Sequence, residues 1–281
     1  MNPLRTAAAS CRAAGPRLGW MPAGEWWPRL DRMALAVWYR NFRAWSHFWR
    51  SSVLLNFGEP VLNLLALGIG LGAHVGDMRG VPFAQYVGPG LLAVTAMNAV
   101  TFDMGFEGFD RLRTTGVYDA MAFSPLSVGQ IVAGELLWES TRSMGYAAIF
   151  LSVLAALGLV QSWWALAVPL LLGVFGAIFG SAALVVVSVA RHHEHLFYYF
   201  TLVITPMFLF SGVFFPVDEL PAAAGAVVRL LPLYHGVEIA RSLILGQVGP
   251  HLLGNLAALG LMAALSVPFP VVMLRRALSA L

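Results

Sequence analysis

Apolar stretches long enough to cross a lipid bilayer recur along almost the whole chain, and no other feature limits its fold as strongly. Roughly 20 helical residues cross a bilayer core of about 30 Å. Such stretches lie near 52–72, 86–107, 131–158, 163–189, 195–215 and 251–274. Only 11% of the 281 residues are charged, against about 25% in a soluble domain. The sequence therefore predicts an all-α integral membrane protein with about six transmembrane helices.

The first fifty residues differ from the rest of the chain. Residues 1–25 contain the single cysteine, Cys11, and no apolar core of signal-peptide length, so we expect a disordered cytoplasmic tail. In residues 26–50 a basic stripe recurs at helical spacing beside many aromatic residues: Arg29, Arg32, Arg40, Arg43, His47 and Arg50. This pattern predicts an amphipathic helix lying in the membrane interface. Two interpretations stay open: the helix is a simple surface anchor, or it is an anchor that also contacts a cytoplasmic partner. The membrane domain then takes residues 51–281.

The arginines indicate how the spans are oriented. Thirteen of the 17 basic residues fall on one side of the predicted spans and three on the other, with Arg142 inside a span. Cytoplasmic loops carry the excess of basic residues. We therefore expect both termini in the cytoplasm, with the chain passing several times through a bacterial inner membrane.

The segment 216–249 is apolar but interrupted by proline and glycine. Its two pieces, 220–231 and 233–246, are too short to cross a bilayer, and apolar segments of about 10–14 residues are typical of re-entrant or interfacial helices. Irregular backbone at membrane depth must be buried in protein or face water. We expect an outer re-entrant helical pair before the last span.

The chain has no lysine, because all 17 basic residues are arginine. A nucleotide-binding phosphate loop needs a lysine to reach the phosphates. A standard ATPase site is therefore excluded. The sequence predicts no catalytic residues, no cofactor and no metal site of its own, and any ATP-Mg must be bound by a partner.

Several strings in a fixed order resemble the membrane subunit of type-2 ABC exporters (the ABC-2 family), in particular its NodJ-like branch, which is named for permeases that export lipo-chitooligosaccharides. They are NFGEP at 56–60 followed by LNLLALGIGLG, YVGPGL at 86–91, GFEGFDRLR at 105–113, YDAMAFSPLSVGQIVAGELLW at 118–138, LFSGVFFPVDELP at 209–221 and LPLYHGVEIAR at 231–241. The resemblance runs from about residue 35 to 275.

The resemblance implies a dimer of permeases bound to two copies of an ABC ATPase subunit. It also implies that the first, second and fifth spans line the path at the dimer interface. The cargo would be an amphiphile: a lipo-oligosaccharide, a polysaccharide precursor or a hydrophobic drug. Membrane lipid is the other expected partner, and no nucleic acid is expected.

The cytoplasmic segment 108–130 is where the resemblance places ATPase docking. Such a surface needs exposed charges for register and an apolar anchor for affinity. The residues expected to couple the ATPase are Asp110, Arg111, Arg113, Tyr118, Met121, Phe123 and Pro125. The alternative is a solvated loop.

Ionisable groups inside a bilayer are candidates for function because they are costly to bury. The candidates are Glu59, Asp103, Glu107, Glu135, Glu139 and Arg142. Arg142 must pair with an acid, either Glu139 on its own helix or Asp103 on the second span. A structural ion-pair network is the favoured interpretation, and a substrate contact is the alternative. Gly176 and Gly180 are expected to let helices approach closely.

Two other classes of function stay open. An ion- or proton-coupled secondary transporter would use Glu59 or the pair Glu139 and Arg142 as a relay. A membrane-embedded enzyme is disfavoured because the chain shows neither a metal-spaced His/Glu set nor an obvious nucleophile–base pair. Transport that survives ATP depletion but collapses with the proton gradient would favour the secondary transporter.

Overall fold

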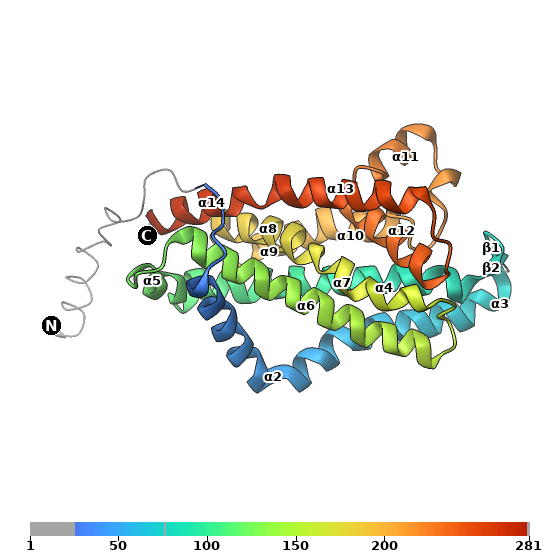
Figure 1. Cartoon of the computed structure of the whole chain (residues 1–281), viewed down its shortest axis with the longest axis horizontal. Helices are drawn as coiled ribbons and strands as arrows, with labels where there is room; N and C mark the ends of the chain where they lie inside the picture. The colour runs from blue at the N-terminus through green and yellow to red at the C-terminus, as the bar shows by residue number, and fades with distance from the viewer. Residues whose placement is uncertain (1–25, 76, 280–281) are drawn as a thin grey trace.

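The computed structural model describes residues 26–75 and 77–279, and Figure 1 shows these residues as an elongated bundle of helices. The predicted disordered tail, 1–25, lies outside the described residues. The first helix, α2 (Arg32–Leu65), is 34 residues long. Asp31 caps its N-terminus by accepting hydrogen bonds from the backbone N–H groups of Met33 and Ala34. This helix runs without a break through residue 50, where the sequence suggested a boundary, and changes direction sharply along its length (Figure 1).

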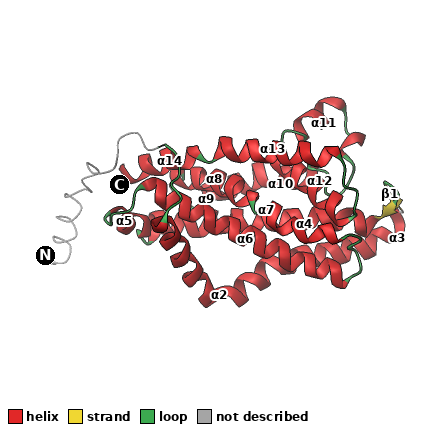
Figure 2. Ribbon diagram, in the orientation of Figure 1, coloured by secondary structure: helices red, strands yellow, loops and turns green. Residues whose placement is uncertain are grey.

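The remaining elements follow in one order along the chain. They are η2 (Ala66–Leu71), α3 (Gly72–Val75), β1 (Asp77–Met78), β2 (Val81–Pro82), α4 (Phe83–Phe102), η3 (Asp103–Glu107), η4 (Asp110–Thr114), α5 (Val117–Ala122), α6 (Val128–Ala156), η5 (Trp163–Ala167), α7 (Val168–Leu172), α8 (Val174–Val189), α9 (Glu194–Tyr199), η6 (Phe200–Ile204), α10 (Thr205–Phe210), η7 (Val217–Glu219), α11 (Ala222–Val228), α12 (Pro232–Ile244), α13 (Pro250–Ser266) and α14 (Pro268–Ser279). Figure 2 shows that helices dominate this architecture.

The β1–β2 hairpin is the departure from the expected all-α fold. Its strands pair antiparallel, with Met78 opposite Val81. The two residues between them, Arg79 and Gly80, both have positive φ, at 49° and 78°. Two such residues suit a tight hairpin turn that matches the twist of the strands. The hairpin lies at the end of the bundle opposite the C-terminus (Figure 1).

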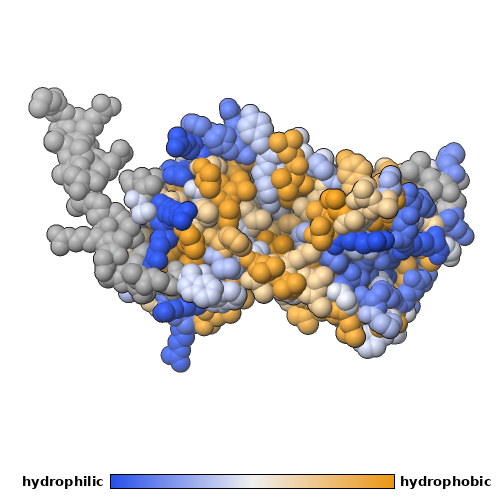
Figure 3. Space-filling model, turned by 90° about the horizontal axis from the view of Figure 1, so that it is seen from above, coloured by the Kyte–Doolittle hydropathy of each residue, from blue (hydrophilic) through white to orange (hydrophobic). Residues whose placement is uncertain are grey.

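All the predicted spans lie mainly on helical backbone. Among the described residues, two helices meet the length and hydropathy of a membrane span by themselves, Trp163–Val189 and Pro250–Ser279. The count of six spans and the re-entrant character of α11 and α12 therefore stay predictions. On the face drawn in Figure 3, apolar side chains cover the middle of the molecule and hydrophilic ones gather toward both ends, as expected for a bundle whose long axis crosses a bilayer.

Helix α6 lies at the centre of the packing, against α2, α4 and α8. Three glycines, one on α6 and two on α8, make its closest contacts possible. A Cβ on Gly134 would lie 2.5 Å from the carbonyl oxygen of Ala34 in α2. A Cβ on Gly176 would overlap the backbone of Ser140, and one on Gly180 would lie 3.3 Å from the Cβ of Glu139. The expected packing role of Gly176 and Gly180 is confirmed.

Candidate functional site

Asp103 and Arg142 form a buried ion pair between η3 and α6. The carboxylate of Asp103 is fully buried, and the side chain of Arg142 is 5% exposed. Trp138 donates a hydrogen bond from Nε1 to the Asp103 Oδ2 atom over 3.3 Å. The guanidinium of Arg142 also lies 5.6 Å from the ring centroid of Tyr146. Of the two acids proposed from the sequence, Asp103 is therefore the one in contact with Arg142.

Glu135 is the second buried acid, one turn before Glu139 on α6. Its carboxylate lies 3.4 Å from the guanidinium of Arg40 in α2 and 3.4 Å from that of Arg111 in η4. Asn41 donates a third contact from Nδ2, at 3.0 Å. Buried charges are stable when they are paired and hydrogen-bonded. Glu135 thus joins the first half of α2 to η4, the segment that follows the second predicted span.

Arg111 connects the two acids. Besides Glu135, it donates a hydrogen bond to Asn41 Oδ1 at 3.2 Å, and its Nη2 lies 3.8 Å from the Asp103 Oδ2 atom. One guanidinium from η4 therefore contacts α2, η3 and α6. We call the set Arg40, Asn41, Asp103, Arg111, Glu135, Trp138, Glu139 and Arg142 the buried charge network.

Glu139 is different from the other members of the buried charge network. Its side chain is completely buried, and neither carboxylate oxygen accepts a hydrogen bond from any residue that the structure describes. It lies beside Asp103 and against Gly180. A buried carboxyl without a hydrogen-bond donor is costly to place in an apolar core, which makes Glu139 the unusual member of the network.

The other two intramembrane candidates are less completely enclosed or not described, although the Glu107 side chain lies beside Asp103. Glu107 ends η3 and is exposed at the surface of the bundle. Glu59 lies in α2, and its side chain is outside the part of the chain that the structure describes.

The predicted coupling residues divide into buried and exposed sets. Phe123, just after α5, is 67% exposed, and Pro125 is exposed as well. Met121 is half-buried and packs against the core. Tyr118 is fully buried, so the expectation that it supplies a surface anchor is wrong. Burial, followed by the nearby Glu135 carboxylate, raises the pKa of the Tyr118 hydroxyl above its ordinary range.

The charged residues of the same segment are also partly turned inward. Arg111 belongs to the buried charge network, which corrects its expected role as an exposed charge. Arg113 donates a hydrogen bond to the Ser188 carbonyl oxygen at 3.3 Å, which links η4 to α8. Asp110 lies 3.3 Å from the Nε2 atom of His193, in the turn before α9. The segment is therefore attached to several helices of the bundle.

Sequence reasoning missed Asn41 and placed Arg40 on the exposed basic stripe. A signal for Asn41 was present, because Ala34, Val37 and Asn41 recur at spacings of three and four residues and all three are buried. That spacing marks the buried face of a helix. Arg40 lies beside this face, and its guanidinium turns inward to Glu135.

The chain is similar to known transport proteins over most of its length. It is 37% identical to Nodulation protein J of Rhizobium leguminosarum bv. viciae over 214 residues, which cover 76% of this chain and 82% of that protein. It is 35% identical to Nodulation protein J of Rhizobium meliloti (strain 1021) over 260 residues, 92% of this chain and 96% of that protein. It is 21% identical to the inner membrane transport permease YadH of Escherichia coli (strain K12) over 213 residues, 75% of this chain and 82% of that protein.

The family comparison agrees with these relatives. Residues 34–245 match the ABC-2 type transporter family. This range begins within α2 and ends just after α12, so it includes every member of the buried charge network. The chain therefore belongs to the ABC-2 type transporter family of integral membrane proteins, with Nodulation protein J among its relatives.

Proposed function

We propose that the chain is the transmembrane permease subunit of an ATP-powered exporter. Two copies span the bacterial inner membrane six times each, with both termini in the cytoplasm, and bind two ABC ATPase subunits. The cargo is an amphiphile that leaves the cytoplasm: a lipo-oligosaccharide, a polysaccharide precursor or a hydrophobic drug. The proposal is supported by membership of the family, by the absence of lysine and by the thirteen-to-three distribution of arginines.

The buried charge network is the observation that carries the coupling mechanism. Arg111 sits in the short segment between α4 and α6, and its guanidinium contacts residues of α2, η3 and α6. A displacement of this segment must either move these helices with it or break contacts among buried charges. Breaking a buried ion pair is strongly unfavourable. The network therefore transmits motion from the ATPase to the helices around the path.

Phe123 is the residue that we assign to docking of the ATPase. It lies at the end of α5, 67% exposed, with Pro125 exposed beside it. A large aromatic side chain on a charged surface is typical of an interface anchor. Asp119 is half-exposed and adds a carboxyl group near this anchor. Its partial burial raises its pKa.

The test is Phe123→Ala in the full chain, co-expressed with its ATPase subunit. We expect membrane insertion and dimerisation to stay unchanged, while ATPase association falls about tenfold or more, because truncation of an interface anchor commonly costs 1–4 kcal/mol. Association is measured by co-purification at graded detergent and salt concentrations.

The matched control is Trp163→Ala. Trp163 is also an exposed aromatic residue, at 88%, but it follows the far end of α6, whereas Phe123 precedes the near end. This variant should keep full ATPase association. Undiminished association of Phe123→Ala, or an equal loss in both variants, would contradict docking at α5.

One observation favours a second function, a proton-coupled secondary transporter. Glu139 is buried and accepts no hydrogen bond from the described residues, as expected of a carboxyl that binds and releases a proton. Transport by Glu139→Gln distinguishes the two functions. An ATP-powered permease keeps its transport when the proton gradient is dissipated, and Glu139→Gln remains active. Loss of transport when the proton gradient is dissipated, together with loss of transport by Glu139→Gln, would establish proton coupling instead.

A further inference from the structure

A polar cavity of about 440 Å³ lies at the end of the bundle opposite the buried charge network. It forms where the β1–β2 hairpin meets α12 and α13, close to the tip seen at the far end in Figure 1. Its walls are Arg79, Val81, Tyr86, Asp218, Tyr234, Glu238, Arg241, Ser242, Leu245, Gln247, His251, Gly254 and Asn255. We call it the outer pocket. Its size falls within the range of about 300–1,000 Å³ that is typical of small-molecule sites.

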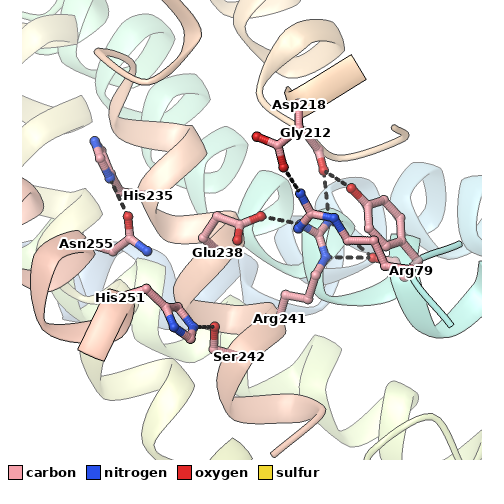
Figure 4. A network of polar contacts seen from close by, with 10 residues as sticks. Arg79, Gly212, Asp218, His235, Glu238, Arg241, Ser242, His251 and Asn255 are labelled. Carbon is pink, nitrogen blue, oxygen red and sulfur yellow. Dashed lines mark hydrogen bonds and ion pairs between the residues drawn. The ribbon is translucent and has the colours of Figure 1, made fainter. Parts of the chain in front are cut away.

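The charged side chains of the outer pocket neutralise one another. Arg241 is 4% exposed, and it donates to Glu238 at 2.7 Å and to the Gly212 carbonyl oxygen at 2.8 Å. Its guanidinium also lies 3.9 Å from the ring centroid of Tyr86. Arg79 pairs with Asp218 at 2.5 Å. Figure 4 shows both arginines held in these contacts. The pocket therefore offers no excess charge to an anion such as phosphate.

The neutral polar groups come from helices that are pinned together. His251 on α13 lies 3.0 Å from the Ser242 hydroxyl on α12. Asn255 on α13 contacts His235 on α12 over 2.8 Å, and both contacts appear in Figure 4. These bridges hold the two walls at a fixed separation. A wall that is already ordered loses less entropy when a ligand binds.

Gln247 supplies hydrogen-bonding groups that the protein does not use. It is exposed on the rim of the outer pocket, and its amide has no hydrogen bond to the residues that the structure describes. The ring of Tyr234, half-buried in the same wall, adds a flat aromatic surface. Amides that donate and accept, beside an aromatic face and without net charge, match a ring that carries hydroxyl groups and apolar C–H faces.

This polar lining is local to one end of the bundle. Another cavity of about 520 Å³ lies between α8 and α13 and is lined almost entirely by apolar side chains, among them Ile178, Val185, Met262, Leu265 and Phe269. Apolar walls are what a bilayer-facing groove requires. The outer pocket has the opposite chemistry, so its ligand is polar.

We propose that the outer pocket binds an uncharged polyhydroxylated group, such as the oligosaccharide portion of an amphiphile, at the outer face of the membrane. The inference rests on the proposed function, which places this end of the bundle outside the cytoplasm. It adds the place where the polar portion of the cargo is bound and the residues that bind it.

The test uses the full chain in lipid nanodiscs, without ATP or the ATPase. Chitotetraose and maltotetraose are the neutral probes, and tetragalacturonate and inorganic phosphate are the charged ones, each titrated by calorimetry. We expect saturable binding of at least one neutral probe. Failure of both neutral probes to bind, or equal or tighter binding of either charged probe, would overturn the proposal.

Gly254 provides the decisive variant. It lines the outer pocket from α13, and a Cβ at this position meets no atom within 4 Å. Gly254→Leu therefore fills the pocket without disturbing the fold, and binding of the neutral probe should fall about tenfold or more, a loss of at least 1.4 kcal/mol. Gly260→Leu is the matched control, because Gly260 lies on the same helix, is equally open and is outside the pocket. It should bind as the wild type does.

A second variant keeps the test decisive if Gly254→Leu is poorly folded. Gln247→Ala changes an exposed side chain and should weaken neutral-probe binding several-fold. Full binding by Gln247→Ala and by folded Gly254→Leu would refute the site. The binding test contains no ATP and no ATPase, so its failure contradicts the outer-pocket site alone. If Phe123→Ala still binds the ATPase fully, that result contradicts the proposed function alone.

Discussion

At the scale of single residues, the chain shows how a charge is accommodated inside an apolar bundle. From the sequence, Arg142 was expected to pair with an acid, either Glu139 or Asp103. It could not decide between them, because both lie within reach of a long side chain. The structure favours Asp103, which also accepts a hydrogen bond from Trp138 and lies near Arg111. Three partners from two elements, α6 and η4, define the position, and only tertiary packing brings them to Asp103.

The Arg142–Asp103 pair leads to the first prediction. Arg142→Leu leaves a buried carboxylate without its main partner, so we expect a marked loss of folded protein, consistent with the roughly 3–5 kcal/mol typical of breaking a buried pair. Arg142→Leu/Asp103→Leu should recover part of this loss. Yield and thermal unfolding in detergent measure both variants.

The double variant Arg142→Leu/Glu139→Leu is the control. It removes an acid that does not contact Arg142 through a hydrogen bond, so it should recover less than the Asp103 double variant. The reverse order would show that Glu139 is the partner in the membrane.

Asp31 gives a second prediction, which concerns pH. The Ala34 backbone N–H group, then the Gln130 side chain, lowers the pKa of Asp31 below its ordinary value of 3.8. A lowered folded-state pKa means that the cap stabilises fully above about pH 4 and is lost as the pH falls through the folded pKa. Asp31→Ala should therefore lower the unfolding midpoint at pH 7, and the gap from the wild type should narrow toward pH 3.

Detergent-solubilised protein suits this measurement. Asp31→Asn is the reference, because asparagine also caps helices but does not titrate. A gap between the wild type and Asp31→Ala that is the same at pH 7 and pH 3 would show that the carboxylate charge is irrelevant to the cap.

At the scale of elements, helices were easier to predict than their connections. The range expected for the third span, 131–158, corresponds closely to α6, Val128–Ala156, because long apolar periodicity is a strong signal. The β1–β2 hairpin was missed. Its turn is Arg79-Gly80, and a non-glycine residue at positive φ is usually Asn or Asp, so the sequence lacked the ordinary turn signal. Tyr118 was misplaced for another reason, since whether a short helix is covered depends on its neighbours.

The crossing of α2 and α6 gives a third prediction. A methyl group at Gly134 would lie 2.5 Å from both the Ala34 carbonyl oxygen and the Val37 Cβ. Gly134→Ala should therefore force the helices apart and destabilise the protein by about 1–3 kcal/mol. Thermal unfolding in nanodiscs and limited proteolysis of the segment before Asn41 report the change.

Gly145→Ala is the matched control on the same helix. A Cβ on Gly145 meets nothing within 4 Å, and alanine favours a helix over glycine by up to about 1 kcal/mol. The two variants should thus shift stability in opposite directions. A shift of the same sign in both would mean that the close crossing is absent in the membrane.

At the scale of the whole molecule, the two ends of the bundle differ in kind. The C-terminus, α5 and the start of α6 share one end, whereas the hairpin and α12 share the other (Figure 1). Residues of the hairpin and α12 line the outer pocket. The arginine distribution predicts that the first end is cytoplasmic. Alkaline phosphatase fused after Leu281 should therefore be inactive in cells, while the same enzyme inserted between Arg79 and Gly80 should be active. Activity of the C-terminal fusion would reverse the topology.

The unbroken course of α2 has a consequence for how the molecule moves. Pro60 removes one backbone N–H donor within α2, yet the helix runs on to Leu65. A helix that stays continuous through a bend moves as one bent body and not as two separately hinged rods. Its first arm is fixed to α6 by the Trp38–Thr141 hydrogen bond of 3.0 Å. Its second arm continues into η2, where a Cβ on Gly68 would lie 3.2 Å from the Cβ of Ala84 in α4. If the first arm lies in the membrane interface, as the sequence predicts, a torque applied to it is delivered as a swing of the second arm.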